Sequence, residues 1–490
     1  MKNKLPIMGI TGFILILGII LGGCSLSRDS PPPKKDIVKI EIKKLPHKTS
    51  YLLGEVPVFD GLEVKVVFTD GSEAICSDYT ARGNTFISGT RSVTVQYANQ
   101  SAAFDIQVAK DLVDTGLPVV YIETENKGEV NSKNVYVKAT MTIKKKGNIE
   151  YEAGMKIRGR GNATWDYPKK PYKIKLDDKA GLLGMDSDKD WVLLANYCDK
   201  SLMRTGIALK AGELLEFPWT PKARFVELVM NGEYLGNYQL AEGVKQGKNR
   251  VDIPKTGFLI EKDSYYREEP VWFETSRGYG YSFKNPDPEK DLNAEQKKYI
   301  QDYLNEFESA LDSDFFDDPG KGYQKYINLE SFVRWYLFQQ VIANLDPNIY
   351  LYKADSGSGS KLLMGPPWDF EWSLGIGWYY GERPRPANYY VMDHDTFYYN
   401  KILQDKAFVA KLQEMWKQYK VRLRQELLAY MDVTKTEIMR SQELNFRRWD
   451  ILKTMVSVGG IPLGSFDAET ACDRQFFINH IDWLEQELGT

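Results

Sequence analysis

The sequence predicts a multidomain protein in which a small all-β sandwich precedes a larger α+β domain with a helical C-terminal part. Apolar and polar residues alternate over residues 37–110, and turn residues separate the runs, as in an antiparallel sandwich. Strand-like and helix-like segments mix over residues 115–343, and the pattern after residue 400 is almost wholly helical. A chain of 490 residues is also long for one core, so two or more domains are expected.

The first residues have the features of a secretory signal. Lys2 and Lys4 precede an apolar run over residues 7–20, and small residues then lead to Cys24. The run is too short to predict a permanent membrane span. Residues 1–23 are therefore interpreted as a signal peptide, and the proline-rich residues 24–36 as a linker.

The segment Leu21-Gly22-Gly23-Cys24 resembles a bacterial lipobox. The resemblance implies cleavage before Cys24 and attachment of lipid to its thiol. The alternative is an uncleaved N-terminal anchor. Both interpretations place the rest of the chain outside the cytoplasmic membrane, in the lipoprotein case anchored to that membrane.

Composition excludes several classes of chemistry. The net charge of -3 and the absence of a long basic run give no reason to expect a nucleic-acid partner. Besides Cys24, only Cys76, Cys198 and Cys472 remain, which predicts neither a disulfide framework nor a zinc site. None of the 3 histidines adjoins a serine or cysteine motif, so a histidine-dependent hydrolase is not expected. Any catalytic reaction of this protein is therefore expected to use carboxylates, lysines and arginines.

Acidic and amide side chains cluster around two short apolar segments in the middle of the chain. Asp346 and Asn348 precede an aromatic strand, and Asp369 and Glu371 follow the next strand along the chain. Because an antiparallel hairpin returns the chain to its start, these four side chains are expected at one end of it. Such oxygen ligands suit Mg²⁺, and a further carboxylate beside the metal can orient a hydroxyl. The alternative is that the aspartates only cap turns.

A basic turn lies earlier in the chain. Arg158-Gly159-Arg160-Gly161 precedes a predicted strand in which Lys173 and Lys175 fall on one face. The glycines allow a tight turn whose backbone amides can approach an anion. This arrangement predicts a phosphate cradle; the alternative is an ordinary exposed strand face that carries lysines.

Two segments of the N-terminal β-region resemble the bacterial Ig-like domains of surface proteins. They are Tyr51-Leu52-Leu53-Gly54-Glu55 and Phe68-Thr69-Asp70-Gly71-Ser72. The resemblance covers about seventy residues of the region 37–110. It implies a spacer or adhesion module without catalysis.

The larger domain resembles the spore coat protein H (CotH) kinase family over about residues 115–450 of a domain taken to span 115–490. The motifs occur in family order: Ile157-Arg158-Gly159, Asn162-Ala163-Thr164-Trp165, Lys169-Lys170-Pro171-Tyr172-Lys173-Ile174-Lys175, Asn231-Gly232-Glu233-Tyr234-Leu235-Gly236-Asn237-Tyr238, Asn344-Leu345-Asp346 and Pro367-Trp368-Asp369-Phe370. The resemblance implies an atypical protein-kinase-like fold with a strand-rich lobe followed by a helical one. Family members include secreted kinases that transfer phosphate from ATP to Ser or Thr with a divalent metal, and others known only as structural coat or surface proteins.

The resemblance also implies roles for the acidic cluster. Asp346 corresponds to the catalytic Asp that orients the acceptor hydroxyl. Asp369 corresponds to the metal-binding Asp, with Glu371 as a second carboxylate in place of the Asp of many relatives. Asn348 is the candidate amide ligand, although it follows Asp346 by two residues, whereas the kinase catalytic loop uses a spacing of five.

Nucleotide binding is assigned by the same resemblance to basic residues. Lys173 or Lys175 would neutralise the phosphates of ATP, beside Arg158 of the basic turn, and Arg204 is a further candidate. The implied cofactors are ATP and Mg²⁺ or Mn²⁺. The expected partner is a protein substrate on the cell surface or coat, and the alternative function is a non-catalytic scaffold that binds glycans through its aromatic residues.

Overall fold

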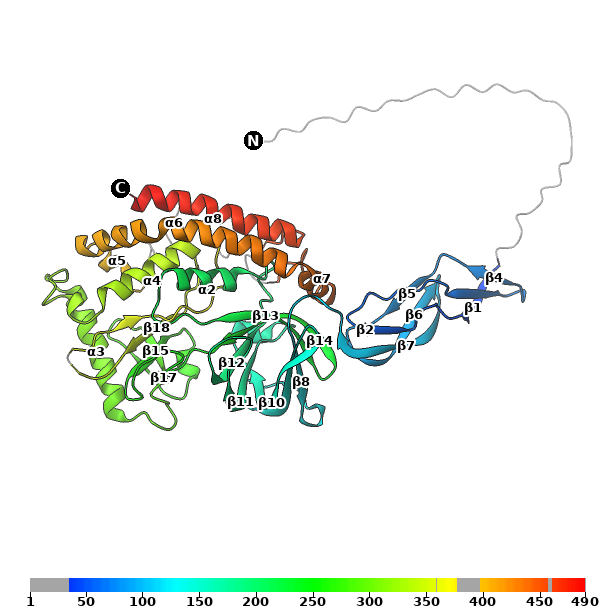
Figure 1. Ribbon diagram of the computed structural model, residues 1–490, viewed down its shortest axis with the longest axis horizontal. Helices are drawn as coiled ribbons and strands as arrows, with labels where there is room; N and C mark the ends of the chain where they lie inside the picture. Colours follow the sequence, from blue (N-terminus) through cyan, green and yellow to red (C-terminus); the bar gives the residue numbers. More distant parts are fainter. Residues whose placement is uncertain (1–34, 358, 377–396, 457–460, 490) are drawn as a thin grey trace, which may run out of the picture. The chain divides into compact units, whose positions relative to one another are not determined.

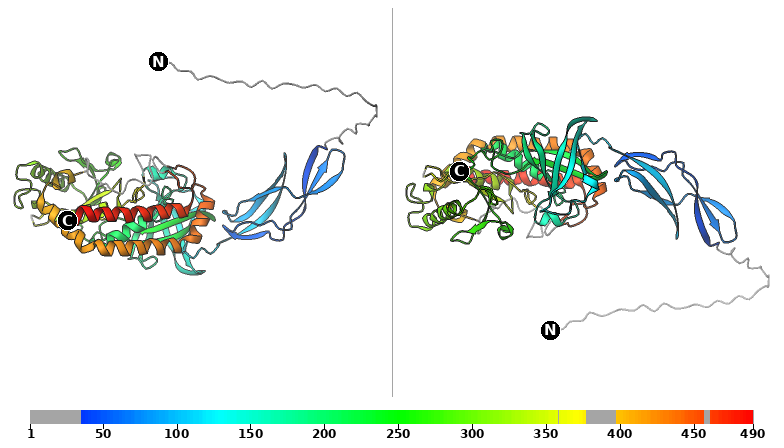
Figure 2. Two further views of the ribbon diagram at one scale, coloured as in Figure 1. Left: turned by 90° about the horizontal axis from the view of Figure 1, so that it is seen from above. Right: turned by 90° about the horizontal axis from the view of Figure 1, so that it is seen from below.

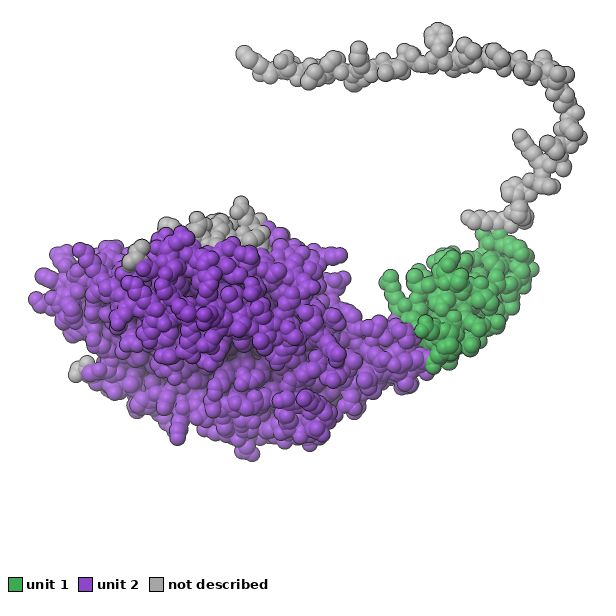
Figure 3. Space-filling view, turned by 45° about the horizontal axis from the view of Figure 1, so that its top comes forward, with its two compact units in different colours: residues 1–47, 59–82, 93–104 green, residues 48–58, 83–92, 105–490 purple. Residues whose placement is uncertain are grey.

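The computed structural model describes residues 35–357, 359–376, 397–456 and 461–489 (Figure 1). The chain forms two compact units, coloured separately in Figure 3. The first comprises residues 1–47, 59–82 and 93–104, and the second comprises residues 48–58, 83–92 and 105–490. Cys24 and the rest of the predicted signal and lipobox lie outside the described residues.

The N-terminal region is entirely β, as predicted. One sheet has the order β1-β3-β4 and the other has the order β2-β7-β6-β5. Their bounds are β1 Ile37–Lys44, β2 Ser50–Leu53, β3 Glu63–Phe68, β4 Glu73–Cys76, β5 Thr80–Gly83, β6 Gly89–Tyr97 and β7 Gln100–Leu112. In β3 the alternation of the sequence is realised directly, since Val64 and Val66 are buried and Lys65 between them is not.

A closed barrel of seven strands follows within the second unit, in the order β10-β11-β12-β14-β13-β8-β9. Its strands are β8 Val119–Thr124, β9 Val137–Lys145, β10 Asn148–Gly159, β11 Tyr172–Ala180, β12 Asp188–Leu194, β13 Ala223–Met230 and β14 Glu233–Glu242. In β11, Tyr172, Ile174 and Leu176 are buried in the barrel core. Lys173 and Lys175 therefore lie on the outer face of the strand, as the alternation predicts.

A five-stranded sheet with the order β16-β17-β15-β18-β19 carries the segments of the acidic cluster. Its strands are β15 Phe258–Lys262, β16 Trp272–Glu274, β17 Gly280–Asn285, β18 Ile349–Lys353 and β19 Leu363–Met364. The sequence pattern indicates an irregular insertion over residues 263–292, whereas the structure places β16 and β17 there. Tyr281 and Phe283 bury their rings in the core and stabilise β17 despite the Glu- and Pro-rich surroundings.

Helices cover the sheets and form the C-terminal part (Figures 1 and 2). Their bounds are α1 Ala163–Asp166, α2 Arg204–Leu214, α3 Ala294–Asp312, α4 Leu329–Ile342, α5 Tyr399–Ile402, α6 Lys406–Glu437, α7 Met439–Arg448 and α8 Phe466–Leu488, with 3-10 turns at Glu125–Lys127, Tyr266–Glu268 and Tyr323–Lys325. The views of Figure 2 show α8 lying along α6. Within the described part of the chain, no helix is both long and apolar enough to cross a bilayer.

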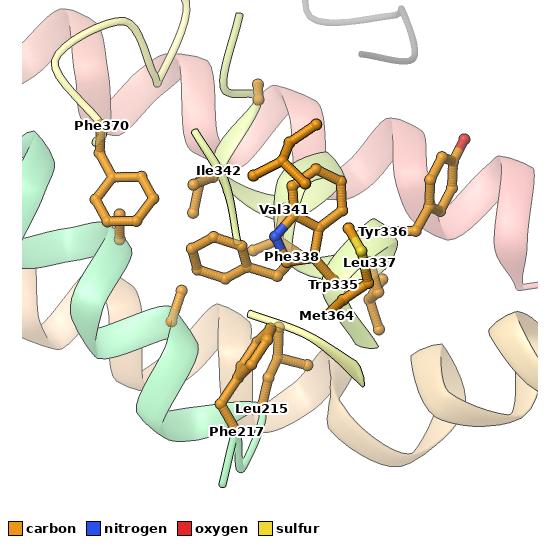
Figure 4. Packing of buried hydrophobic residues seen from close by; sticks show 14 of the residues in the cluster. Leu215, Phe217, Trp335, Tyr336, Leu337, Phe338, Val341, Ile342, Met364 and Phe370 are labelled. Carbon is orange, nitrogen blue, oxygen red and sulfur yellow. The ribbon is translucent and has the colours of Figure 1, made fainter. Parts of the chain in front are cut away.

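The largest core surrounds α4, whose side chains pack against neighbouring helices and strands (Figure 4). The rings of Phe217 and Phe370 lie 5.5 and 5.6 Å from that of Phe338 on α4. One face of α6 is also buried, with Phe408, Leu412, Met415, Trp416 and Tyr419 among its buried residues. This core fixes the end of α4, and the acidic cluster begins immediately after it.

Candidate active site

Two acidic segments meet just beyond α4. The amide of Leu345 donates to the carbonyl of Trp372 at 3.1 Å, and the side-chain amide of Asn344 donates to the carbonyl of Asp369 at 3.0 Å. Strands β18 and β19 pair antiparallel, with Leu351 opposite Met364. The hairpin interpretation thus describes the backbone correctly, because both acidic segments lie at the same end of this pair.

Phe370 anchors the second segment. Its ring is 1% exposed and packs on α4, as Figure 4 shows. The preceding residue, Asp369, adopts a positive φ of 68°, a conformation uncommon outside glycine. The turn consequently buries Phe370 and leaves the Asp369 carboxylate accessible to solvent. Strained backbone of this kind is frequent at functional sites.

The carboxyl groups at this turn have raised pKa values. Crowding by protein atoms removes water from Asp369 and raises its pKa to about 6, with Arg160 opposing the shift and Asp346 adding to it. Solvent still reaches this carboxylate and screens those neighbouring charges. Burial raises the pKa of Glu371 to about 8, and the charges of Asp369 and Asp199 act in the same direction. A nearby cation would stabilise the ionised form of both.

Asp346, the predicted catalytic residue, is exposed on the first acidic segment. Desolvation raises its pKa, and the ammonium of Lys262 at the end of β15 opposes this shift. Lys262 also lies over the ring of Tyr279, with 5.5 Å from Nζ to the ring centroid. The Asp346 carboxylate thus has a cation near it and an open side toward solvent.

Asn348 is held by a residue that the sequence interpretation did not include. Its Nδ2 donates to Oε1 of Glu261 on β15 at 2.6 Å, and Oε2 of Glu261 lies 2.6 Å from Nζ of Lys284 on β17. Burial alone would raise the pKa of Glu261, but Lys284 reverses this effect and the pKa lies below its usual value. The Oδ1 atom of Asn348 is buried and has no hydrogen-bond partner among the described residues.

The basic residues gather on the outer face of β10 and β11. Arg158 lies directly opposite Lys173 in the strand pair, and Lys175 lies opposite Lys156. Burial lowers the pKa of Lys173 to about 8; Asp190 opposes this effect, and the charges of Arg158, Lys284 and Arg160 reinforce it. Cations placed this close to one another favour a bound anion.

None of Lys173, Arg158 and Arg160 forms an ion pair within 4.0 Å with a carboxylate of the described chain. The guanidinium groups of the two arginines lie over aromatic rings, Arg158 over Tyr136 at 5.1 Å and Arg160 over Trp368 at 5.6 Å. Cation–π contacts leave the hydrogen-bond donors of a guanidinium available. Arg158 and Lys173 therefore lie side by side on this face with no carboxylate of the described residues within ion-pair distance, and their role as a phosphate cradle stays a prediction.

The glycine turn beside these cations requires its glycines. Gly161 has a φ of 86°, and a Cβ there would lie 2.1 Å from Oγ1 of Thr164. A Cβ on Gly159 would lie 2.3 Å from the ring of Trp165. The motif residues Thr164 and Trp165 therefore pack closely against the turn that positions Arg160.

The placement of Arg204 does not support phosphate contact. Its side chain is 0% exposed, and its guanidinium binds Asp199 at 2.8 Å and Asp473 at 2.7 Å. Burial alone would lower its pKa, but the two carboxylates raise it above its usual value. Helix α2 begins at Arg204, whose backbone amide donates to Oδ2 of Asp199 at 2.9 Å. We assign Arg204 to the structural contact between α2 and α8.

Lys169, within the basic motif, is a second residue with a structural environment. It is 1% exposed and donates to the carbonyl of Asn237 and to Oδ1 of Asn445. Burial lowers its pKa to about 7, against the opposing charges of Glu227 and Glu371. This buried lysine connects β14 with α7 directly behind the acidic turn.

A comparison with protein-family models identifies two regions. The model of the CotH kinase protein family matches residues 157–485, and that of the bacterial Ig-like domain (group 3) matches residues 45–108. The chain belongs to the CotH kinase family. The CotH match includes the end of β10 with Arg158, strand β11 with Lys173 and Lys175, the five-stranded sheet and both acidic segments. A search among curated proteins found no match.

Proposed function

We propose that this protein is an atypical protein kinase that transfers the terminal phosphoryl group of ATP to Ser or Thr residues of surface or coat proteins. The observation that carries the proposal is the pairing of two features in one CotH domain. The acidic segments meet beyond α4, and Arg160 lies over Trp368, the residue before Asp369, at 5.6 Å. Arg160 follows the end of β10, the strand on which Arg158 lies opposite Lys173. Phosphoryl transfer needs this combination of carboxylates for a metal and cations for phosphate.

A divalent cation fits the oxygen atoms present. The carboxylates of Asp369 and Glu371 and the unpartnered Oδ1 of Asn348 would hold Mg²⁺ or Mn²⁺, which prefer such ligands. No three His, Cys, Asp or Glu side chains form a ready-made metal cluster among the residues that the structure describes. This suits a cation that keeps several waters and takes further ligands from phosphate. When bound, the cation supplies charge neutralisation.

The chain's own residues would bind the phosphate groups and orient the acceptor hydroxyl. Lys173, Arg158 and Arg160 bind phosphate oxygens, with Lys175 further along the same strand face. Asp346 accepts a hydrogen bond from the acceptor hydroxyl and orients its oxygen for attack. The exposure of Asp346 allows a side chain from another protein to approach.

The test compares Asp369→Ala with Asp346→Asn in nucleotide binding and in transfer of labelled phosphate. Asp369→Ala is expected to abolish metal-dependent ATP binding and transfer together, because it removes the main cation ligand. Asp346→Asn should retain binding and slow transfer by about 10²–10⁴-fold, the usual effect of losing a positioned acid–base group. Acceptors are the protein itself and a surface extract, with Mg²⁺ and then Mn²⁺.

Asp314→Ala, which removes an exposed acid on the segment after α3, is the matched control and should leave both readouts unchanged. Equal transfer by the parent and by Asp369→Ala would assign the activity to a contaminant. If ATP and metal do not raise the melting temperature of the parent protein, the result would support the scaffold function in place of the kinase.

A further inference from the structure

The side-chain amide of Asn348 has one satisfied end and one free end. Its nitrogen donates to Glu261 at 2.6 Å, whereas Oδ1 is buried without a partner in the described chain. The orientation of the amide follows from chemistry, because an ionised carboxylate only accepts hydrogen bonds and the NH₂ group must face it. The carbonyl oxygen therefore points away from Glu261.

Glu261 is itself fixed in place. It lies on β15 opposite Tyr350 of β18, two residues after Asn348, and is 6% exposed. Its second oxygen lies 2.6 Å from Nζ of Lys284 on β17, the strand on the other side of β15. The hydroxyl of Tyr350 also hydrogen-bonds to this carboxylate. Lys284, Tyr350 and Asn348 together thus fix Glu261, and Glu261 in turn fixes the orientation of the Asn348 amide.

We propose that Glu261, held by Lys284, is a positioning residue that turns the carbonyl oxygen of Asn348 toward a divalent cation. Other buried side-chain oxygens, such as Oδ1 of Asn237, also lack a partner in the described chain. The oxygen of Asn348 differs because it lies two residues after Asp346 in the acidic segment, where a bound cation would complete it. Partners of this kind, one shell behind a metal ligand, commonly set the orientation of that ligand. The inference rests on the proposed function, because it assigns Asn348 to the cation of that site.

The experiment measures Mn²⁺ binding to the whole chain by electron paramagnetic resonance, with and without ATP. In Glu261→Gln the new side chain has one acceptor oxygen and one donor nitrogen, so Lys284, the Tyr350 hydroxyl and the Asn348 nitrogen compete for a single oxygen. The amide of Asn348 can then turn and engage its carbonyl oxygen. We expect Mn²⁺ affinity to fall by about 10–100-fold, the usual effect of losing such a partner.

Glu269→Gln is the matched control, because Glu269 lies 3.5 Å from Lys284 and its change also removes one negative charge beside that lysine. It forms no hydrogen bond with Asn348, so Mn²⁺ affinity should remain that of the parent. Equal losses in the two variants would mean that charge alone is responsible, and would overturn the proposal.

A double-mutant cycle with Asn348→Ala distinguishes positioning from general support of the fold. If Glu261 acts through Asn348, Glu261→Gln should cause no further loss of Mn²⁺ affinity in the Asn348→Ala background. A lower melting temperature with parent-like Mn²⁺ affinity would overturn the inference and leave the kinase function standing. A parent chain that binds no Mn²⁺ would overturn both.

Discussion

Asp369 and Glu371 lie on either side of a buried phenylalanine, and the charge of Asp369 makes Glu371 harder to ionise. In the absence of a cation, this arrangement is unfavourable at neutral pH. The stability of the folded protein should therefore depend on the protonation of Glu371, whose pKa is raised more strongly than that of Asp369.

The pH dependence of stability tests this expectation. The ordinary pKa of Glu371 is 4.5 and its folded value is about 8, so between these values the folded protein holds a proton that the unfolded chain has lost. The free energy of unfolding should therefore fall as pH rises through this window. Across this window, the free energy of unfolding of the metal-free parent should fall by about 1–2 kcal/mol more than that of Glu371→Gln. The effect is limited because the side chain is partly accessible to water, which screens its charge.

Urea denaturation at several pH values measures the difference between the parent and Glu371→Gln. Excess Mg²⁺ should reduce the pH dependence of the parent's free energy of unfolding, because the cation stabilises the ionised carboxylate. Glu268→Gln, at an exposed position, serves as the control. Parallel pH profiles for the parent and Glu371→Gln without metal would contradict the expectation.

At the scale of single elements, the sequence predicted what depends on local periodicity. The alternation in β11 places Lys173 on the outer face, and the short distance along the chain between the two acidic segments predicts their hairpin. Contacts between distant segments leave no such pattern. Glu261 contacts Asn348 across 87 positions of sequence, and Arg204 contacts Asp473 across 269. The first contact added a residue to the candidate site, and the second assigned Arg204 to a structural ion pair.

The contact between β14 and α7 gives a prediction for one pair of elements. Oδ1 of Asn445 on α7 accepts from Nζ of Lys169 at 2.9 Å and from the amide of Asn237 at 3.1 Å. Asn445→Ala removes an acceptor from two buried donors, which should lower the free energy of unfolding by about 1–3 kcal/mol. Urea denaturation measures the loss. Glu443→Ala, at an exposed position on the same helix, should change stability by less than about 0.5 kcal/mol, and an equal loss there would contradict this explanation.

At the scale of the whole molecule, an Ig-like region precedes a CotH kinase domain, and a lipobox-like segment precedes both. We propose that the chain is lipid-anchored to the bacterial membrane on its outer side, where its acceptor proteins would also reside. On this proposal, the membrane would separate the proposed kinase from cytoplasmic ATP, and the supply of nucleotide would limit its activity.

Membrane attachment is tested by Cys24→Ser. If lipid on the Cys24 thiol anchors the protein, the variant should leave the detergent phase or keep its uncleaved signal, which a change of mass detects. Cys76→Ser, at a buried thiol of the β-region, is the control and should remain with the membrane. Unchanged detergent partitioning of Cys24→Ser with an intact cleavage site would exclude lipid anchoring through this residue.

The hydrogen bonds that join the two acidic segments have a consequence for the evolution of the family. The Leu345 amide donates to the Trp372 carbonyl and the Asn344 side-chain amide donates to the Asp369 carbonyl, so neither bond uses a carboxylate. A single substitution of Asp346 or Asp369 can therefore remove the chemistry while the backbone around it persists. In such an arrangement, substitutions can remove catalytic residues without loss of the fold. One lineage can therefore contain active enzymes beside inactive descendants with nearly the same structure.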